Sequence, residues 1–126
     1  MKFEAAVVLA LAAWTISSQA MGQDARDVAE GQNVFKRMCG MCHSPARGEN
    51  RIGPSLFGVV GRRSGTAEGF VYSIAMKKKA VTWDDATLDK YLKDPRAFAP
   101  GTKMTFAGLR KPEERRQVIA FLKSLH

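Results

Sequence analysis

The pattern of hydrophobic and polar positions along the chain predicts helices separated by long loops. Between Asp24 and Met38, small and apolar residues recur at the spacing of one helix face: Val28, Gly31, Val34, Phe35 and Met38. A second helix is predicted in the stretch TWDDATLDKYLKDP, with Thr82 as its N-cap and Asp85 in its first turn. That helix must end before Pro95, because the residue preceding a proline disfavours helical geometry.

A last helix is predicted to begin at Lys111, with Pro112 at its first position and two glutamates near the positive end of the helix dipole. Its buried stripe consists of Val118, Ile119, Leu122 and Leu125. Residues 44–81 are rich in glycine and contain two prolines, so they should form loops and turns rather than long elements. No stretch alternates convincingly like a strand. Loops this long exceed what a compact domain usually tolerates, and a bound group filling the centre would account for them.

The first twenty residues have the organisation of an export signal. Lys2 precedes an apolar run from Ala5 to Trp14, and Ser18-Gln19-Ala20 forms a small-x-small cleavage site. The run is too short to span a bilayer comfortably. We therefore expect a secretory signal peptide at residues 1–20 and one mature domain at residues 21–126 in the periplasm. Cleavage after Gly22, or retention of the segment as an amphipathic helix or membrane anchor, are the alternatives.

Composition limits the 126-residue chain to one small domain with a formal net charge of +8. The predicted signal contains one base and one acid, so the mature domain keeps this charge. A basic surface steers a protein toward acidic docking sites in a salt-dependent way. The basic residues include Lys36, Arg37, Lys77, Lys78, Lys79, Lys103, Arg110 and Lys111, and the resemblance described below implies that several of these positions lie near the docking face. Anionic lipid headgroups are a second target, whereas no nucleic-acid partner is expected because no nucleic-acid motif occurs.

The stretch MCGMCHSP carries the most specific chemistry in the chain. Its two cysteines, Cys39 and Cys42, are the only ones present, and His43 follows directly. Cys-x-x-Cys-His is the attachment signature of c-type haem, in which two thiols hold one porphyrin and the histidine ligates the iron. A disulfide redox pair would want a βαβ setting, which is not predicted here. A structural zinc ion would need four ligands, which the two cysteines, His43 and His126 could barely supply.

A haem held in this way needs either a second axial ligand or an open face. Met104 follows Pro100-Gly101, which breaks any helix and delivers an extended segment that could reach the ring. Met76, in the basic run SIAMKKKA, is the poorer candidate. Histidine–methionine ligation raises the potential of haem iron and leaves no open position, which suits electron transfer rather than oxygen chemistry.

From about Asp27 to the C-terminus, the chain resembles the class I cytochromes c, both the mitochondrial protein and the bacterial short-chain soluble forms. Six motifs carry the resemblance in order: CGMCH, IGPSLFGVVGRRSG, GFVYSIAMK, VTWDDATLDKYLKDP, PGTKMTFAGL and ERRQVIAFLKS. The resemblance implies an all-α class I cytochrome c fold, with three main helices and long loops wrapped around one covalently bound haem c. It also implies a monomeric one-electron carrier that is not an enzyme. Such a carrier would shuttle electrons between a membrane cytochrome bc complex or periplasmic dehydrogenase and a terminal oxidase or photosynthetic reaction centre.

The resemblance assigns roles to individual positions. Cys39 and Cys42 would form the thioethers, with His43 as the proximal and Met104 as the distal ligand of the iron. The carbonyl of Pro54 would accept the other ring N–H of the histidine. The residues matching the donors to a buried haem propionate are Arg62, Tyr72 and Trp83. Tyr91 and Thr102 match the polar pair near the methionine sulfur and the second propionate. Phe106 matches the aromatic residue beside the exposed haem edge. The terminal helices would cross where Gly31 and Phe35 meet Val118 and Phe121.

The chain departs from the mitochondrial pattern at a few places. Met76 stands where those proteins have an asparagine in a buried water network, Phe121 replaces a tyrosine, and one residue fewer separates His43 from Pro54. A different class of function, a haem enzyme such as a weak peroxidase or a gas sensor, would need the Met104 side to be open or labile. The sequence supplies no distal histidine or acid–base pair for that side. A role as a module of a multi-subunit dehydrogenase is a third hypothesis.

Overall fold

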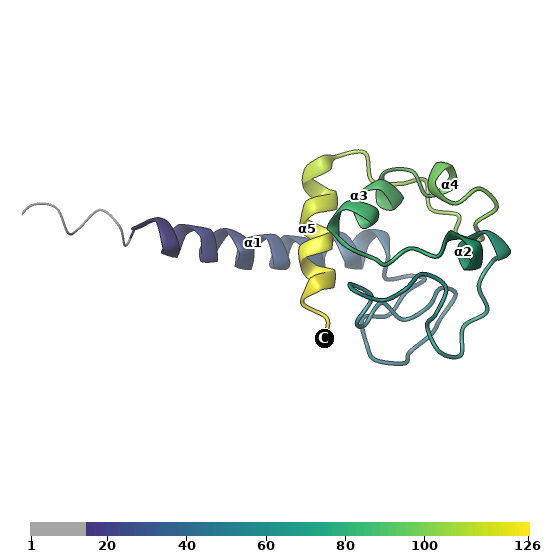
Figure 1. Ribbon diagram of the computed structural model, residues 1–126. Helices are drawn as coiled ribbons and strands as arrows, with labels where there is room; N and C mark the ends of the chain where they lie inside the picture. The colour runs from purple at the N-terminus through teal and green to yellow at the C-terminus, as the bar shows by residue number, and fades with distance from the viewer. Residues whose placement is uncertain (1–14) are drawn as a thin grey trace, which may run out of the picture.

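The computed structural model describes the backbone of residues 15–126 and the side chains from Gly22 onward. Five helices occur in this part of the chain: α1 Thr15–Met38, α2 Ile74–Lys79, α3 Asp85–Lys93, α4 Pro95–Phe98 and α5 Pro112–Lys123. Between residues 15 and 126 no strand forms, and one isolated antiparallel bridge joins Arg63 to Thr82. The all-α fold, with α1, α3 and α5 as its three main helices and long loops between them, is confirmed (Figure 1).

The two terminal helices cross each other and form one side of the molecule (Figure 1). Gly31 lies at the crossing, where a Cβ atom would overlap the backbone of Gln117. Close by, the rings of Phe35 and Phe121 pack with their centroids 5.3 Å apart, and Val118 is almost completely buried. The predicted contact between the terminal helices is therefore confirmed, and glycine is required because the backbones approach too closely for a side chain.

Within the described residues, helix α1 already includes Thr15, so the prediction that it starts near Asp24 is wrong. The added turns contain no proline and only one glycine, Gly22, so nothing in this stretch interrupts helical hydrogen bonding. In Figure 1 this first half of α1 projects away from the body of the protein. Residues 1–14, most of the predicted signal peptide, lie outside the described residues. No helix in the described part of the chain is both long and apolar enough to cross a bilayer.

Residues 44–81 form loops and turns, as predicted, with α2 as their one short helix. The Ser73 hydroxyl caps α2 by accepting a hydrogen bond from the Met76 backbone N–H at 3.1 Å. The predicted stop before Pro95 is also confirmed, because α3 ends at Lys93. A single further turn, α4, was not predicted. It begins at Pro95 and is capped by the Asp94 carboxylate, which accepts from the Ala97 N–H at 3.1 Å.

The prediction that Thr82 caps α3 is wrong, because Asp84 occupies that position. The Asp84 carboxylate accepts from the Thr87 N–H at 2.8 Å, and the Thr87 hydroxyl accepts from the Asp84 N–H at 2.9 Å. This reciprocal pair is a capping box. The start of α5 agrees with the prediction, with Pro112 as its first residue and Lys111 before it.

The core next to these elements is aromatic. The Trp83 ring centroid lies 5.0 Å from that of Tyr91 and 5.8 Å from that of Phe98. The Lys79 ammonium group lies 4.2 Å from the Phe98 ring centroid, which joins α2 to α4. Since edge and stacked aromatic pairs add to the stability given by burial alone, this cluster holds the short helices together. Met76 packs into the same core with 7% of its surface exposed.

Candidate functional site

The two cysteines and the histidine lie on one extra turn that continues from α1. The N–H groups of Cys39 and Gly40 both donate to the Phe35 carbonyl at 2.8 Å, and the His43 N–H donates to the Cys39 carbonyl at 2.9 Å. Cys39 and Cys42 are half-buried free thiols, not joined in a disulfide. Burial, with a smaller effect of the neighbouring Cys42, raises the pKa of the Cys39 thiol to about 11. Because no disulfide joins them, both sulfur atoms are available for bonds to another group.

The His43 imidazole is held in a single orientation by the backbone of residues 53 and 54. Its Nδ1 lies 2.8 Å from the Pro54 carbonyl, as predicted, so a neutral His43 donates its Nδ1–H there and keeps the Nε2 lone pair free. Burial is the largest effect on this residue and lowers the pKa of His43, the Pro54 hydrogen bond opposes it, and the nearby Arg62 charge lowers the pKa further. A neutral imidazole with one nitrogen fixed and the other free is the form that ligates metals.

Gly53 is a site residue that the sequence interpretation missed. A Cβ atom at this position would overlap the ring of His43, so the imidazole packs directly on the glycine backbone. The Gly53 N–H also donates to the Cys42 carbonyl at 2.8 Å, which ties this segment to the attachment turn. The available signal was the position of the glycine directly before Pro54 in the motif IGP.

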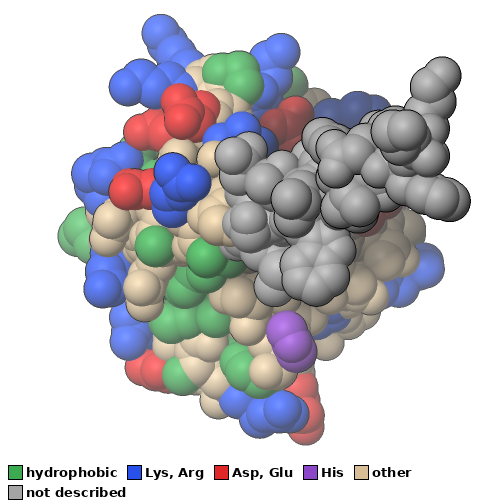
Figure 2. Space-filling model, turned by 90° about the vertical axis from the view of Figure 1, so that its left-hand side faces the viewer, with side chains coloured by type: hydrophobic (Ala, Val, Ile, Leu, Met, Phe, Trp, Pro, Cys, Tyr) green, Lys and Arg blue, Asp and Glu red, His purple; other side chains and the backbone are tan. Residues whose placement is uncertain are grey.

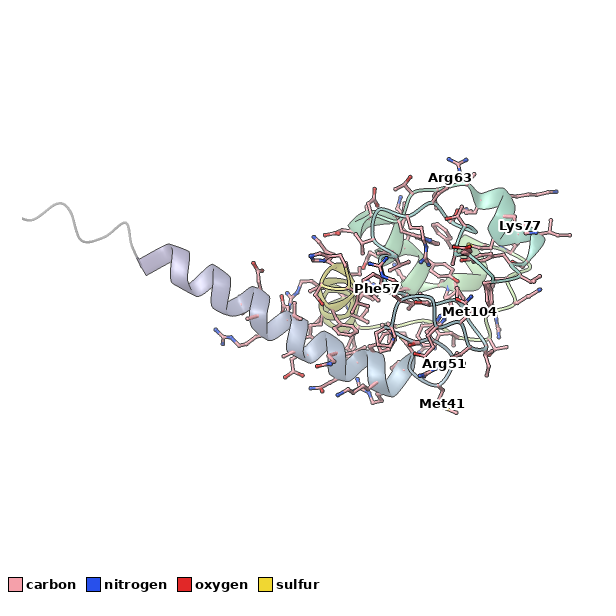
Figure 3. All side chains as sticks on the ribbon, turned by 90° about the horizontal axis from the view of Figure 1, so that it is seen from below. Met41, Arg51, Phe57, Arg63, Lys77 and Met104 are labelled. Atoms are coloured by element: carbon pink, nitrogen blue, oxygen red, sulfur yellow. The ribbon has the colours of Figure 1, made fainter. Side chains whose placement is uncertain are left out.

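Met104 lies in the extended segment after α4 and is half-buried. The Tyr91 hydroxyl donates to its Sδ at 3.6 Å, and the Met104 N–H donates to the Thr102 hydroxyl at 3.3 Å. Burial raises the pKa of Tyr91, and a hydrogen bond with Thr102 partly opposes this. In Figure 3, Met104 lies inward among crowded side chains, whereas Met41 points outward and is 90% exposed. The structure therefore brings Tyr91 and Thr102 together with Met104, as predicted.

The predicted propionate donors lie on neighbouring loops. Arg62 donates to the Ser55 carbonyl at 3.1 Å and to the Phe57 carbonyl at 3.3 Å. The backbone N–H of Trp83 donates to the backbone carbonyl of Arg62 at 2.9 Å, which places the two residues side by side.

The Tyr72 hydroxyl accepts from the Ala67 N–H at 3.0 Å, so its own O–H remains free to donate. Phe106 is half-buried and packs against the core. The contact of these side chains with a propionate or a haem edge stays a prediction.

The donor set fits haem iron and does not fit a protein-only metal site. In the described residues, no group of three or more His, Cys, Asp and Glu side chains is placed to hold a metal ion. The described residues therefore do not provide the set of side chains that a four-coordinate zinc ion requires. A porphyrin supplies four nitrogens, so its iron needs at most two donors from the protein, and two thiols beside a fixed imidazole match covalent haem attachment.

Comparisons with known proteins agree with this chemistry. The family model described as Cytochrome c matches residues 28–126. The chain belongs to the cytochrome c family.

Two relatives and one solved structure show how far the likeness extends. Cytochrome c of Chlamydomonas reinhardtii is 52% identical over 100 residues, which cover 79% of this chain and 89% of that protein. Cytochrome c2 of Rhodomicrobium vannielii is 46% identical over 122 residues, or 96% of this chain and 94% of that protein. The structure of cytochrome cH from Methylobacterium extorquens is 42% identical, with a TM-score of 0.73, and the match covers 78% of this chain and 98% of that one.

Membership in the cytochrome c family establishes the cofactor and the broad function. The cofactor is one haem c, attached through the two cysteines of the Cys-x-x-Cys-His motif. The protein is an electron carrier that works in association with redox partners, as cytochromes c do.

The basic residues expected to face these partners differ in whether their side chains already contact another residue of the protein. Arg37 forms an ion pair with Glu114 at 3.0 Å, and Lys79 lies over the Phe98 ring. The remaining residues of the predicted set are exposed: Lys36, Lys77, Lys78, Lys103, Arg110 and Lys111. On the face drawn in Figure 2, lysine and arginine side chains lie around the margin and alternate with acidic ones rather than forming one continuous patch.

Proposed function

We propose that the protein is an exported one-electron carrier whose haem iron is ligated by His43 and Met104. The observation that carries this proposal is the contact of Met104 Sδ with the Tyr91 hydroxyl at 3.6 Å, beside Thr102. A sulfur already oriented by the protein supports a closed sixth position rather than one open to a gas or a peroxide.

The residues on both sides support transfer with little rearrangement. When bound, the haem supplies an iron that alternates between Fe(III) and Fe(II). Pro54 fixes the imidazole of His43 through Nδ1, and Tyr91 and Thr102 hold the segment with Met104. Because each donor is fixed by a separate contact and partly shielded from water, neither has to reorient when the charge on the iron changes.

The finer assignment of partners is part of the same proposal. The electron donor would be a membrane cytochrome bc complex or a periplasmic dehydrogenase, and the acceptor a terminal oxidase or a photosynthetic reaction centre. The net charge of +8 and the exposed basic residues support docking on acidic faces of such complexes, and secondarily on anionic membrane surfaces. The protein would act as a monomer in the periplasm.

Export rests on the predicted signal at residues 1–20. Helix α1 continues through Ala20 and Gly22, so cleavage at either position would shorten this helix without touching the crossing at Gly31. We expect the exported protein to begin at Met21 or Gln23 when its intact mass is measured. A mass that retains residues 1–20 in the extracytoplasmic fraction would instead support an uncleaved anchor.

Replacement of Met104 tests the ligand assignment directly. Met104→Ala should lose the weak long-wavelength charge-transfer band of sulfur-ligated ferric haem and should gain affinity for added imidazole. The matched control is Met76→Leu, because Met76 packs in the core and a leucine of similar volume should leave the band unchanged. If Met104→Ala kept methionine ligation while Met76→Leu lost it, the assignment of the two methionines would be reversed.

A further inference from the structure

The segment that carries Met104 has no helix or strand of its own from Gly101 to Lys111. Upstream of the methionine, the Thr102 N–H donates to the Ala99 carbonyl at 2.9 Å, and the Thr102 hydroxyl accepts from the Met104 N–H. Downstream, the Leu109 N–H donates to the Leu92 carbonyl at 2.8 Å. Tyr91 and Thr102 therefore hold the methionine directly, and Leu109 is the point at which the segment is attached to the helices on its downstream side.

One side chain of α5, that of Arg115, binds the backbone of the segment at Leu109 and Arg110. Arg115 Nη1 donates to the Leu109 carbonyl at 2.8 Å and to the Arg110 carbonyl at 3.0 Å. Arg115 Nε donates to the Asp89 carboxylate on α3 at 2.7 Å. Only 7% of the Arg115 side chain is exposed, against 46% of the Asp89 side chain. One guanidinium group thus joins α3, α5 and the segment that bears Met104, and Figure 1 shows α3 beside α5.

The backbone next to these hydrogen bonds, at Gly108 and Leu109, packs closely against the end of α3. Gly108 has a φ of +109°, and a Cβ atom there would overlap the Lys93 carbonyl at the end of α3. Leu109 is 2% exposed. Because the chain is pressed against α3 at these two residues, losing the guanidinium contacts would loosen a tightly packed junction rather than a free loop.

We propose that Arg115, supported by Asp89, is a positioning residue that controls how often Met104 leaves the iron. A buried guanidinium is costly unless its donors are paired, and here two carbonyls and a carboxylate pair them. The inference rests on the proposed ligation by Met104. Arg115 does not touch the iron site and acts only through the segment between Met104 and Leu109.

The test is a titration of the ferric holoprotein with imidazole, which binds only the molecules whose sulfur has left the iron. The apparent affinity of such a ligand is proportional to the fraction of molecules that are open. Arg115→Met should raise the apparent imidazole affinity by about tenfold, the effect of a 1.4 kcal/mol shift in the opening equilibrium. Asp89→Asn should raise it by a smaller factor, because the two carbonyl contacts of Arg115 remain.

The matched control is the neighbouring arginine on the same helix. Arg116 pairs with Asp27 of α1 at 3.2 Å, and its side chain is 56% exposed, so its charge is paired with α1 rather than with the Met104 segment. Arg116→Gln should leave the imidazole affinity at the wild-type value even if it lowers the melting temperature.

The outcomes separate this inference from the proposal on which it rests. If wild-type protein bound imidazole as readily as Met104→Ala, ligation by Met104 would be refuted. If wild type resisted imidazole and a folded Arg115→Met did so equally, or if Arg116→Gln raised the affinity as much, only the role of Arg115 would be refuted. If Arg115→Met failed to fold, the Asp89→Asn variant would decide. An imidazole affinity of that variant equal to the wild-type value would refute the role of Arg115.

Discussion

Tyr91 connects the methionine sulfur to the aromatic core. Its hydroxyl donates to Met104 Sδ, while its ring packs against Trp83 and Phe98. A hydrogen bond to the sulfur withdraws electron density from it, which makes the sulfur a weaker donor to ferric iron and favours the ferrous state. The packing of the ring means that the hydroxyl can be removed without emptying the site.

Tyr91→Phe should therefore lower the reduction potential. The loss of one hydrogen bond worth about 0.5–1.5 kcal/mol corresponds to roughly 20–60 mV for a one-electron couple. Spectroelectrochemical titration of both proteins measures the difference, with the sulfur charge-transfer band as the control that Met104 remains bound. A potential that stays the same or rises would show that the hydroxyl does not act on the sulfur.

At this scale the sequence predicted the residues with a motif and missed those whose role depends on tertiary contacts. The attachment motif indicated Cys39, Cys42 and His43 because its spacing is local. Gly53 is indicated only by its position before Pro54, and Arg115 lies in an ordinary helical stretch with no motif. Gly53 matters because a ring from another segment packs on it, and Arg115 because α5 meets α3 and the Met104 segment at one point.

Among the helices, the N-terminus of α3 shows why a cap can be misplaced by two residues. Thr82 and Asp84 are both good N-cap residues, so the local sequence does not decide between them. The choice is made by Trp83, whose N–H donates to the Arg62 carbonyl and whose carbonyl accepts from the Gly61 N–H at 2.7 Å. These bonds tie the backbone of Trp83 to residues 61 and 62, and the helix can begin only after it.

The Asp84 cap makes one part of the stability depend on pH. Hydrogen bonds, first from the Thr87 backbone and then from its hydroxyl, lower the pKa of Asp84 below its ordinary value of 3.8. A lowered pKa in the folded state means that the contribution is complete above about pH 3.8 and is lost as the pH falls through the folded-state value. Asp84→Ala should therefore be less stable than wild type at pH 7, and the difference should shrink below pH 3.8.

Denaturant unfolding at neutral and acidic pH measures this difference, and Asp84→Asn is the matched control. An asparagine keeps an accepting oxygen but has no charge to titrate, so its difference from Asp84→Ala should not vary with pH. If the gap between wild type and Asp84→Ala were equally large at pH 7 and below pH 3, the carboxylate would not be the source of the stabilisation.

For the whole molecule, the helical pattern predicted the three main helices, and the long loops were explained by a central bound group. The helix α1 was predicted too short, because its apolar spacing, on which the prediction relied, begins only at Val28, whereas helical hydrogen bonding continues upstream. Helices of four and six residues were not predicted, since their caps at Asp94 and Ser73 depend on the path of the surrounding loops.

The net charge acts at this same scale and predicts how fast the protein meets a partner. With +8 charges, the rate of electron transfer to an oxidase with an acidic docking face should fall about tenfold or more between roughly 10 mM and 150 mM salt. Stopped-flow measurements give this rate, and reduction by a neutral hydroquinone, which should change little with salt, is the control. If the two reactions depended equally on salt, electrostatic steering of the protein toward its partner would be refuted.

The most direct test of a closed, two-ligand haem iron is the visible absorption spectrum of the dithionite-reduced holoprotein before and after addition of carbon monoxide. If His43 and Met104 both hold the iron, the low-spin spectrum of a c-type haem will remain unchanged at neutral pH. A shift of the Soret band on addition of carbon monoxide would mean that the sixth position is open or labile. That result would contradict the carrier proposed here and favour a haem enzyme or gas sensor.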